Sequence, residues 1–100
     1  MTIRVLARAV ARPESRSALR AALTENMLAS RLEAGCVRYE LAQSTTEPDE
    51  FVTLEEWRTE ADVAAHLKTP HVQALLAKAL ALLAAPPDIR TYRTLPDRAE

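Results

Sequence analysis

Apolar and polar residues recur along the chain with two different periods, one typical of strands and one typical of helices. Residues 3–12 are rich in β-branched and apolar side chains on both faces, which is typical of a strand covered on two sides. Residues 14–32 follow Pro13 with apolar side chains at helical spacing, interrupted only by Asn26 and Ser30. The first third of the chain therefore predicts a strand followed by an amphipathic helix.

The only glycine of the chain, Gly35, stands just past the end of this helix. A left-handed residue that ends a helix is most often glycine, because glycine has no Cβ. We therefore expect Gly35 to cap the helix in the left-handed conformation. Residues 36–43 and 51–58 are then typical of two strands, and the polar, turn-forming residues 44–50 between them predict a hairpin.

The second half of the chain predicts two successive helices and a closing strand. Thr59 is placed to cap the first helix, in which His66 and Leu67 share a face with Val63. Thr69 and Pro70 begin the second helix. This helix carries the strongest apolar stripe of the sequence, which ends at two prolines and consists of Val72, Leu75, Leu76, Ala79, Leu80 and Leu83.

We expect this stripe to be buried, so that Asp in place of Leu76 or Leu80 would unfold the protein. Residues 89–95 form the predicted closing strand. The resulting order of strand, helix, strand, strand, helix pair, strand is the split βαβ arrangement of a ferredoxin-like α+β sandwich, with an antiparallel sheet and helices on one face.

A chain of 100 residues fits one domain, spanning residues 1–100. The helices can cover only one face of the sheet, and the other face carries apolar residues of the first strand. A second copy of the chain is the natural cover for that face. The sequence therefore predicts a homodimer in the form of a dimeric α+β barrel.

Composition argues against several classes of partner. The 13 basic and 14 acidic residues give a formal net charge of -1, and no basic run marks a nucleic-acid surface. No apolar stretch reaches the roughly 20 residues that a membrane span needs. The opening MTIRV lacks the features of an export signal, which favours a cytoplasmic protein. Cys36 is the only cysteine, and the two histidines show no metal-ligand spacing, so neither a disulfide nor a metal site is expected.

Three segments together resemble the antibiotic biosynthesis monooxygenase family: residues 33–41 (EAGCVRYEL), 51–57 (FVTLEEW) and 66–71 (HLKTPH). The resemblance spans nearly the whole chain and implies the ferredoxin-like fold. It does not select one reaction, because proteins that look like this include quinol and anthrone monooxygenases, haem-degrading enzymes and an isomerase. The haem-degrading members use an Asn on the first strand and an iron-ligating His on the last helix. This chain has neither, with Leu76 near the helix position, so no haem is expected.

The monooxygenases of this family work without metal or flavin, so the resemblance implies no cofactor. A phenolic substrate is deprotonated, and its anion reacts with O₂ inside a dry cavity that contains a base. Glu55 and Trp57 lie two apart on the predicted third strand and share a face with Phe51. Tyr39 is on the partner strand and His66 on a helix. We therefore expect His66 and Glu55 to be catalytic, and Tyr39, Trp57 and Phe51 to bind substrate.

Structural roles for the same residues remain open alternatives. His66 could be a packed residue bonded to a carboxylate, and Glu55 could only hold it in place. His71, in the first turn of its helix, is expected to be exposed or to contribute to the cap. Arg38 and Arg90 could steer an anionic substrate, although exposed positions at the rim are the default for both.

The leading hypothesis is a cofactor-independent monooxygenase of a small phenolic, quinol or related aromatic substrate. One alternative is an isomerase or lyase of a small oxygenated metabolite, with His66 and Glu55 as acid and base. Another is a non-catalytic domain that binds a small molecule on the same fold.

Overall fold

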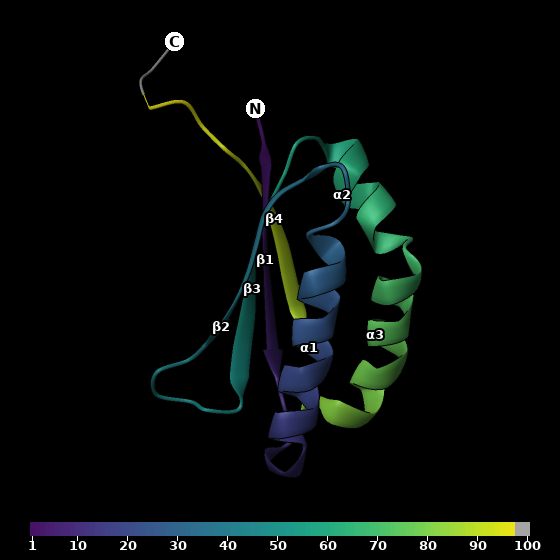
Figure 1. The fold of residues 1–100 in the computed structure, drawn as a ribbon. Helices are drawn as coiled ribbons and strands as arrows, with labels where there is room; N and C mark the ends of the chain where they lie inside the picture. The colour runs from purple at the N-terminus through teal and green to yellow at the C-terminus, as the bar shows by residue number, and fades with distance from the viewer. Residues whose placement is uncertain (98–100) are drawn as a thin grey trace.

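A computed structural model describes residues 1–97 and shows a four-stranded antiparallel sheet with helices on one face (Figure 1). Residues 98–100 of the predicted single domain lie outside the described residues. The elements follow one another as β1 (Ile3–Val10), η1 (Pro13–Ser15), α1 (Arg16–Ser30), β2 (Cys36–Gln43), β3 (Glu50–Trp57), α2 (Glu60–Leu67), α3 (Pro70–Leu82) and β4 (Asp88–Arg93). This order confirms the predicted α+β, ferredoxin-like class, with element ends displaced by a few residues.

The sheet has the strand order β2-β3-β1-β4, so the first strand is central. The pairing places Val5 of β1 opposite Glu55 of β3 and opposite Thr91 of β4, while Tyr39 of β2 lies opposite Glu55. Directly paired residues of neighbouring strands point to the same side of a sheet. The register therefore aligns Tyr39, Glu55, Val5 and Thr91 in one row on the side of the helices.

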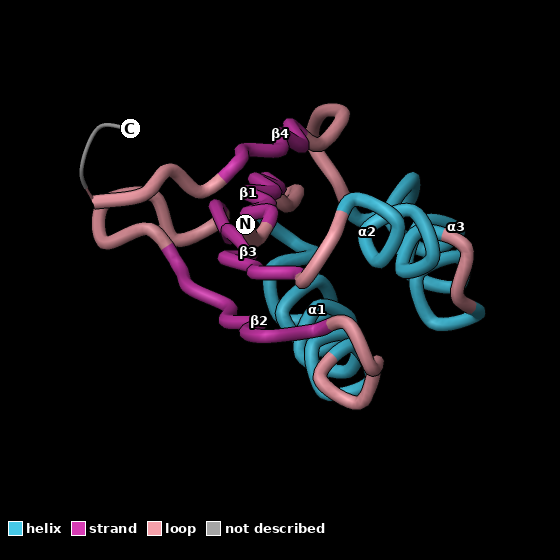
Figure 2. Tube along the Cα trace, turned by 90° about the horizontal axis from the view of Figure 1, so that it is seen from above, coloured by secondary structure: helices cyan, strands magenta, loops and turns pink. Residues whose placement is uncertain are grey.

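All three α-helices lie on one side of the sheet, as the view from above shows (Figure 2). The core between the layers has two clusters of buried residues. One contains Ala11, Leu19, Leu23 and Phe51, and the other contains Val5, Tyr39 and Trp57. Among the described residues, no helix has the length and apolar character that crossing a bilayer requires.

The predicted cap at Thr59 is confirmed, and Thr69, which was predicted to begin the next helix with Pro70, is the cap of that helix. The Thr59 hydroxyl accepts a hydrogen bond from the backbone N–H of Asp62 at 3.1 Å, and the Thr69 hydroxyl accepts one from the N–H of Val72 at 3.4 Å. Such side chains satisfy backbone donors that the first turn of a helix leaves free. Thr59 thus precedes the first residue of α2, and Thr69 precedes the first residue of α3.

The expected left-handed cap at Gly35 is wrong, since no glycine of the chain has a positive φ. Gly35 instead lies against the beginning of α2, where a Cβ would collide with the side chain of Asp62. Its carbonyl accepts a hydrogen bond from the N–H of Arg58 at 2.9 Å. The glycine therefore permits a close approach between two segments rather than an unusual backbone conformation.

The predicted burial of Leu76 and Leu80 is also wrong, because these residues are 43% and 85% exposed. On α3 only Val72 is buried, and Leu75 and Leu82 are partly buried against the core. The helix packs against α1, but this contact does not cover the whole apolar stripe. Leu76 instead faces a pocket between α3 and the sheet.

Candidate functional site

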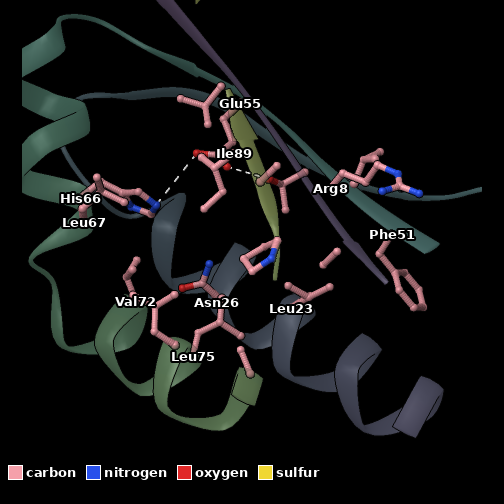
Figure 3. A pocket seen from close by; sticks show the side chains of 18 of the residues that line it. Arg8, Leu23, Asn26, Phe51, Glu55, His66, Leu67, Val72, Leu75 and Ile89 are labelled. Atoms are coloured by element: carbon pink, nitrogen blue, oxygen red, sulfur yellow. Dashed lines mark hydrogen bonds and ion pairs between the residues drawn. The ribbon is translucent and has the colours of Figure 1, made fainter. Parts of the chain in front are cut away.

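The pocket lies between the sheet and the three helices and has a volume of about 170 Å³ (Figure 3). Most of its wall is apolar, from residues such as Val5, Leu23, Val72 and Leu75. Its polar lining includes Asn26, Tyr39, Thr53, Glu55 and His66. An apolar protein cavity of about 150 Å³ accommodates benzene, so this volume suits a single aromatic ring.

Glu55 is buried and is held by donors from its own strand. Thr53 Oγ1 donates to Glu55 Oε2 at 2.7 Å, and Trp57 Nε1 donates to Glu55 Oε1 at 2.9 Å. Residues two apart on a strand point to the same side, which is why β3 can supply all three groups. The two hydrogen bonds fix the orientation of the carboxylate at the pocket wall.

His66 is buried on α2 between two carboxylates. Its Nδ1 lies 2.7 Å from Glu33 Oε2, and its Nε2 lies 3.9 Å from Glu55 Oε1. An ionised carboxylate only accepts hydrogen bonds, so Nδ1 carries a proton. In the neutral imidazole, the lone pair of Nε2 then points toward Glu55, and the 3.9 Å gap is longer than a hydrogen bond.

Glu33 was not among the residues expected from the sequence, yet it joins both histidines. His71 Nε2 lies 2.8 Å from the same Glu33 oxygen that contacts His66, and 3.2 Å from Thr69 Oγ1. His71 was expected to be exposed or to contribute to the cap of α3. Its contact with the capping hydroxyl of Thr69 agrees with the second alternative, and the contact with Glu33 was not expected. The only sequence signal was that Glu33 and His71 belong to the segments that carry the family resemblance.

Two nitrogens and one oxygen could in principle hold a metal ion, and the ligand atoms of Glu33, His66 and His71 lie within 4.8 Å of one another. Ligands of a tetrahedral Zn²⁺ at about 2.0–2.1 Å would be separated by about 3.3 Å. The observed 2.7 and 2.8 Å are hydrogen-bond lengths. We therefore interpret the cluster as a hydrogen-bonded carboxylate that orients two imidazoles.

Tyr39 contributes a buried hydroxyl to the pocket. Burial, together with the neighbouring negative charge of Glu55, raises the pKa of Tyr39 well above its ordinary value. The phenol thus keeps its proton at neutral pH and is unsuited to act as the base. Its oxygen accepts a hydrogen bond from Asn26 Nδ2 at 3.1 Å.

Comparison with known proteins shows which family this chain is similar to. Residues 2–78 match the family model described as "Antibiotic biosynthesis monooxygenase". The chain belongs to the antibiotic biosynthesis monooxygenase family. It is 36% identical to "Putative monooxygenase YcnE" of Bacillus subtilis (strain 168) over 78 residues, which cover 78% of this chain and 82% of that protein.

A second relative and two solved structures are also similar to this chain in sequence and in fold. The chain is 36% identical over 84 residues to "Putative monooxygenase Rv0793" of Mycobacterium tuberculosis, covering 84% of this chain and 82% of that protein. The solved structure of Rv0793 superimposes with a TM-score of 0.91 at 31% identity, over 99% and 100% of the two chains. The crystal structure of PA3566 from Pseudomonas aeruginosa superimposes with a TM-score of 0.89 at 29% identity, over 95% of each chain.

The other two residues predicted to bind substrate, Trp57 and Phe51, stand in different relations to the pocket. Trp57 is fully buried behind the pocket, where its ring lies 4.4 Å from that of His66, and it does not belong to the lining. It positions Glu55 and His66 instead. Phe51 lines the far part of the pocket, but its ring packs in the core with Leu19 and stands apart from Glu55 (Figure 3).

The two arginines considered for steering a substrate lie outside the pocket. Arg38 is opposite Glu56 and Arg90 is opposite Leu6, on the face of the sheet that points away from the helices. Both are exposed, and Arg90 pairs with Asp88 at 3.0 Å. Of the predicted site residues, the structure thus brings together His66, Glu55, Tyr39 and Trp57, and the first three of these line the pocket.

Proposed function

We propose that this protein is a cofactor-independent monooxygenase that oxidises a small phenol or quinol with O₂. The observation that carries the proposal is the pair of acceptors, His66 Nε2 and Glu55 Oε1, which are 3.9 Å apart at the polar end of the pocket. A phenolic O–H placed there meets a base, while the apolar wall surrounds the ring. Membership of the family is the second support.

In the proposed reaction, His66 Nε2 takes the proton of the substrate hydroxyl. Glu33, which accepts from Nδ1 at 2.7 Å, stabilises the positive charge that forms on the imidazole. A ring carbon of the electron-rich anion then bonds to O₂. The protonated peroxide loses water, so one oxygen atom becomes a ring carbonyl and the other leaves as water. The substrate supplies all the electrons, and no external reductant is needed.

Oxygen uptake with labelled O₂ tests the proposal directly. We expect the protein, with a chelator present, to consume one O₂ per molecule of a suitable hydroquinone or phenol and to insert one ¹⁸O atom into the product. Deuterium exchange into a substrate without O₂ uptake would instead favour the isomerase or lyase. Binding with neither reaction would indicate a non-catalytic domain.

We also propose that the protein is a homodimer that packs sheet against sheet. Leu6 and Leu54 are paired across β1 and β3 on the face that no described helix covers, and they are 43% and 38% exposed. Arg8 with Glu50 and Arg4 with Glu56 place charges of both signs around them. A face with an apolar centre and both signs of charge can be complementary to itself across a two-fold axis.

Light scattering at low micromolar concentration is expected to give twice the mass of one chain. Leu54→Lys should shift the mass toward that of a monomer, because it would bury an unpaired charge in the interface. Leu32→Lys is the matched control, since Leu32 is 88% exposed in the turn after α1 and should leave the mass unchanged. A parent protein that is monomeric at this concentration contradicts the proposal.

A further inference from the structure

Asn26 interrupts the apolar side of α1 at a position that faces the pocket. It is 4% exposed, between the buried Leu23 and Ser30 on the same helix, and it belongs to the lining. Figure 3 shows its side chain extending from α1 into the pocket, with His66 and Glu55 bordering the same space. An amide buried among apolar groups is unfavourable unless its polar atoms find partners.

Only one end of this amide has a partner. Asn26 Nδ2 donates to Tyr39 Oη at 3.1 Å, whereas Asn26 Oδ1 is buried without a hydrogen-bond partner among the described residues. In this orientation of the amide, Asn26 Nδ2 faces Tyr39 Oη, and the hydroxyl oxygen accepts its hydrogen bond. Oδ1 is therefore the end of the amide that lacks a partner.

We infer that Asn26 is a specificity-determining residue whose carbonyl oxygen accepts a hydrogen bond from the ligand. The ligand is then a single ring with a donor group, a hydroxyl or N–H, in addition to the hydroxyl that faces His66 and Glu55. This inference rests on the proposed function, because it takes the pocket as the substrate site. An apolar or methylated ring would leave the buried oxygen unpaired and would be selected against.

The test compares two ligands of nearly equal size, hydroquinone and 4-methylphenol, in which a methyl group replaces the second hydroxyl. Binding is followed without oxygen through the fluorescence of Trp57, the only tryptophan, whose ring lies beside His66. We expect the parent protein to bind hydroquinone about tenfold more tightly. Catechol and resorcinol, compared with the corresponding methylphenols, show which spacing of the two groups Asn26 recognises.

In Asn26→Leu, the preference for the dihydroxy ring should fall to about one or reverse. Leu75→Met is the matched control, because it is an apolar change of similar volume in the same pocket and should preserve the preference. Circular dichroism establishes that both variants are folded. If Asn26→Leu does not fold, the inference can still be refuted, because the two ligands are also compared in the parent protein.

Three outcomes would each overturn the inference. The parent protein could bind each dihydroxy ring and the corresponding methylphenol with equal affinity, the preference could survive in Asn26→Leu, or no single-ring probe could bind. Because binding is measured without turnover, the two proposals fail separately. A donor preference without O₂ uptake would refute the monooxygenase and retain the role of Asn26. Oxygen uptake without a donor preference would refute the role of Asn26 and retain the monooxygenase.

Discussion

His66→Ala is expected to lower the rate of phenol oxygenation by about 10²–10⁴-fold, the usual contribution of a general base. Its Nε2 faces Glu55 at the polar end of the pocket, and its Nδ1 proton is held by Glu33. Glu55→Gln should have a smaller effect, because the amide oxygen can still accept from a neighbouring donor while the negative charge is lost. The measurement is the rate of O₂ uptake per folded subunit.

His71→Ala provides the matched control for this experiment. His71 is the other histidine bonded to Glu33, and it does not line the pocket. Its removal should therefore change the rate only a few-fold. If His66 has only a structural role, His66→Ala will lower the melting temperature and reduce the rate in proportion to the folded fraction. Equal rates per folded subunit in the parent, His66→Ala and Glu55→Gln would exclude the pair from the mechanism.

Leu19→Ala is expected to lower the free energy of unfolding by about 2–5 kcal/mol, the usual effect of deleting a buried leucine side chain. Leu19 is 1% exposed on α1 and packs in the core cluster with Phe51. The loss combines the transfer of the side chain from water with the cavity that remains. Urea unfolding monitored by circular dichroism measures it.

Leu80→Ala makes the same chemical change on α3, where the side chain is 85% exposed, and should alter the free energy of unfolding by about 0.5 kcal/mol or less. Equal losses in the two variants would show that α3 is covered in solution. A loss for Leu80→Ala that grows with protein concentration would place Leu80 in a contact between copies.

Part of the site could be predicted from the sequence because its signals are local. The two-residue period of a strand places Thr53, Glu55 and Trp57 on one side of β3, and Thr59 and Thr69 mark the beginnings of α2 and α3 by their capping chemistry. The order of elements then follows from the same periods. Together with the segments that resemble the family, these signals were sufficient to select His66 and Glu55 as candidate catalytic residues.

The sequence by itself thus determined the elements, their order and the side of β3 that carries Glu55. Only the tertiary structure decided that Glu33 joins His66 to His71. The sequence separation between Glu33 and His66 is 33 positions, and that between Glu33 and His71 is 38 positions. The same holds for Asn26 and Leu80, whose surroundings depend on how α1 and α3 lie against the sheet. Local periodicity specifies which side of a helix is apolar, but the packing of neighbouring elements decides how much of that side is buried and which polar atoms face a pocket.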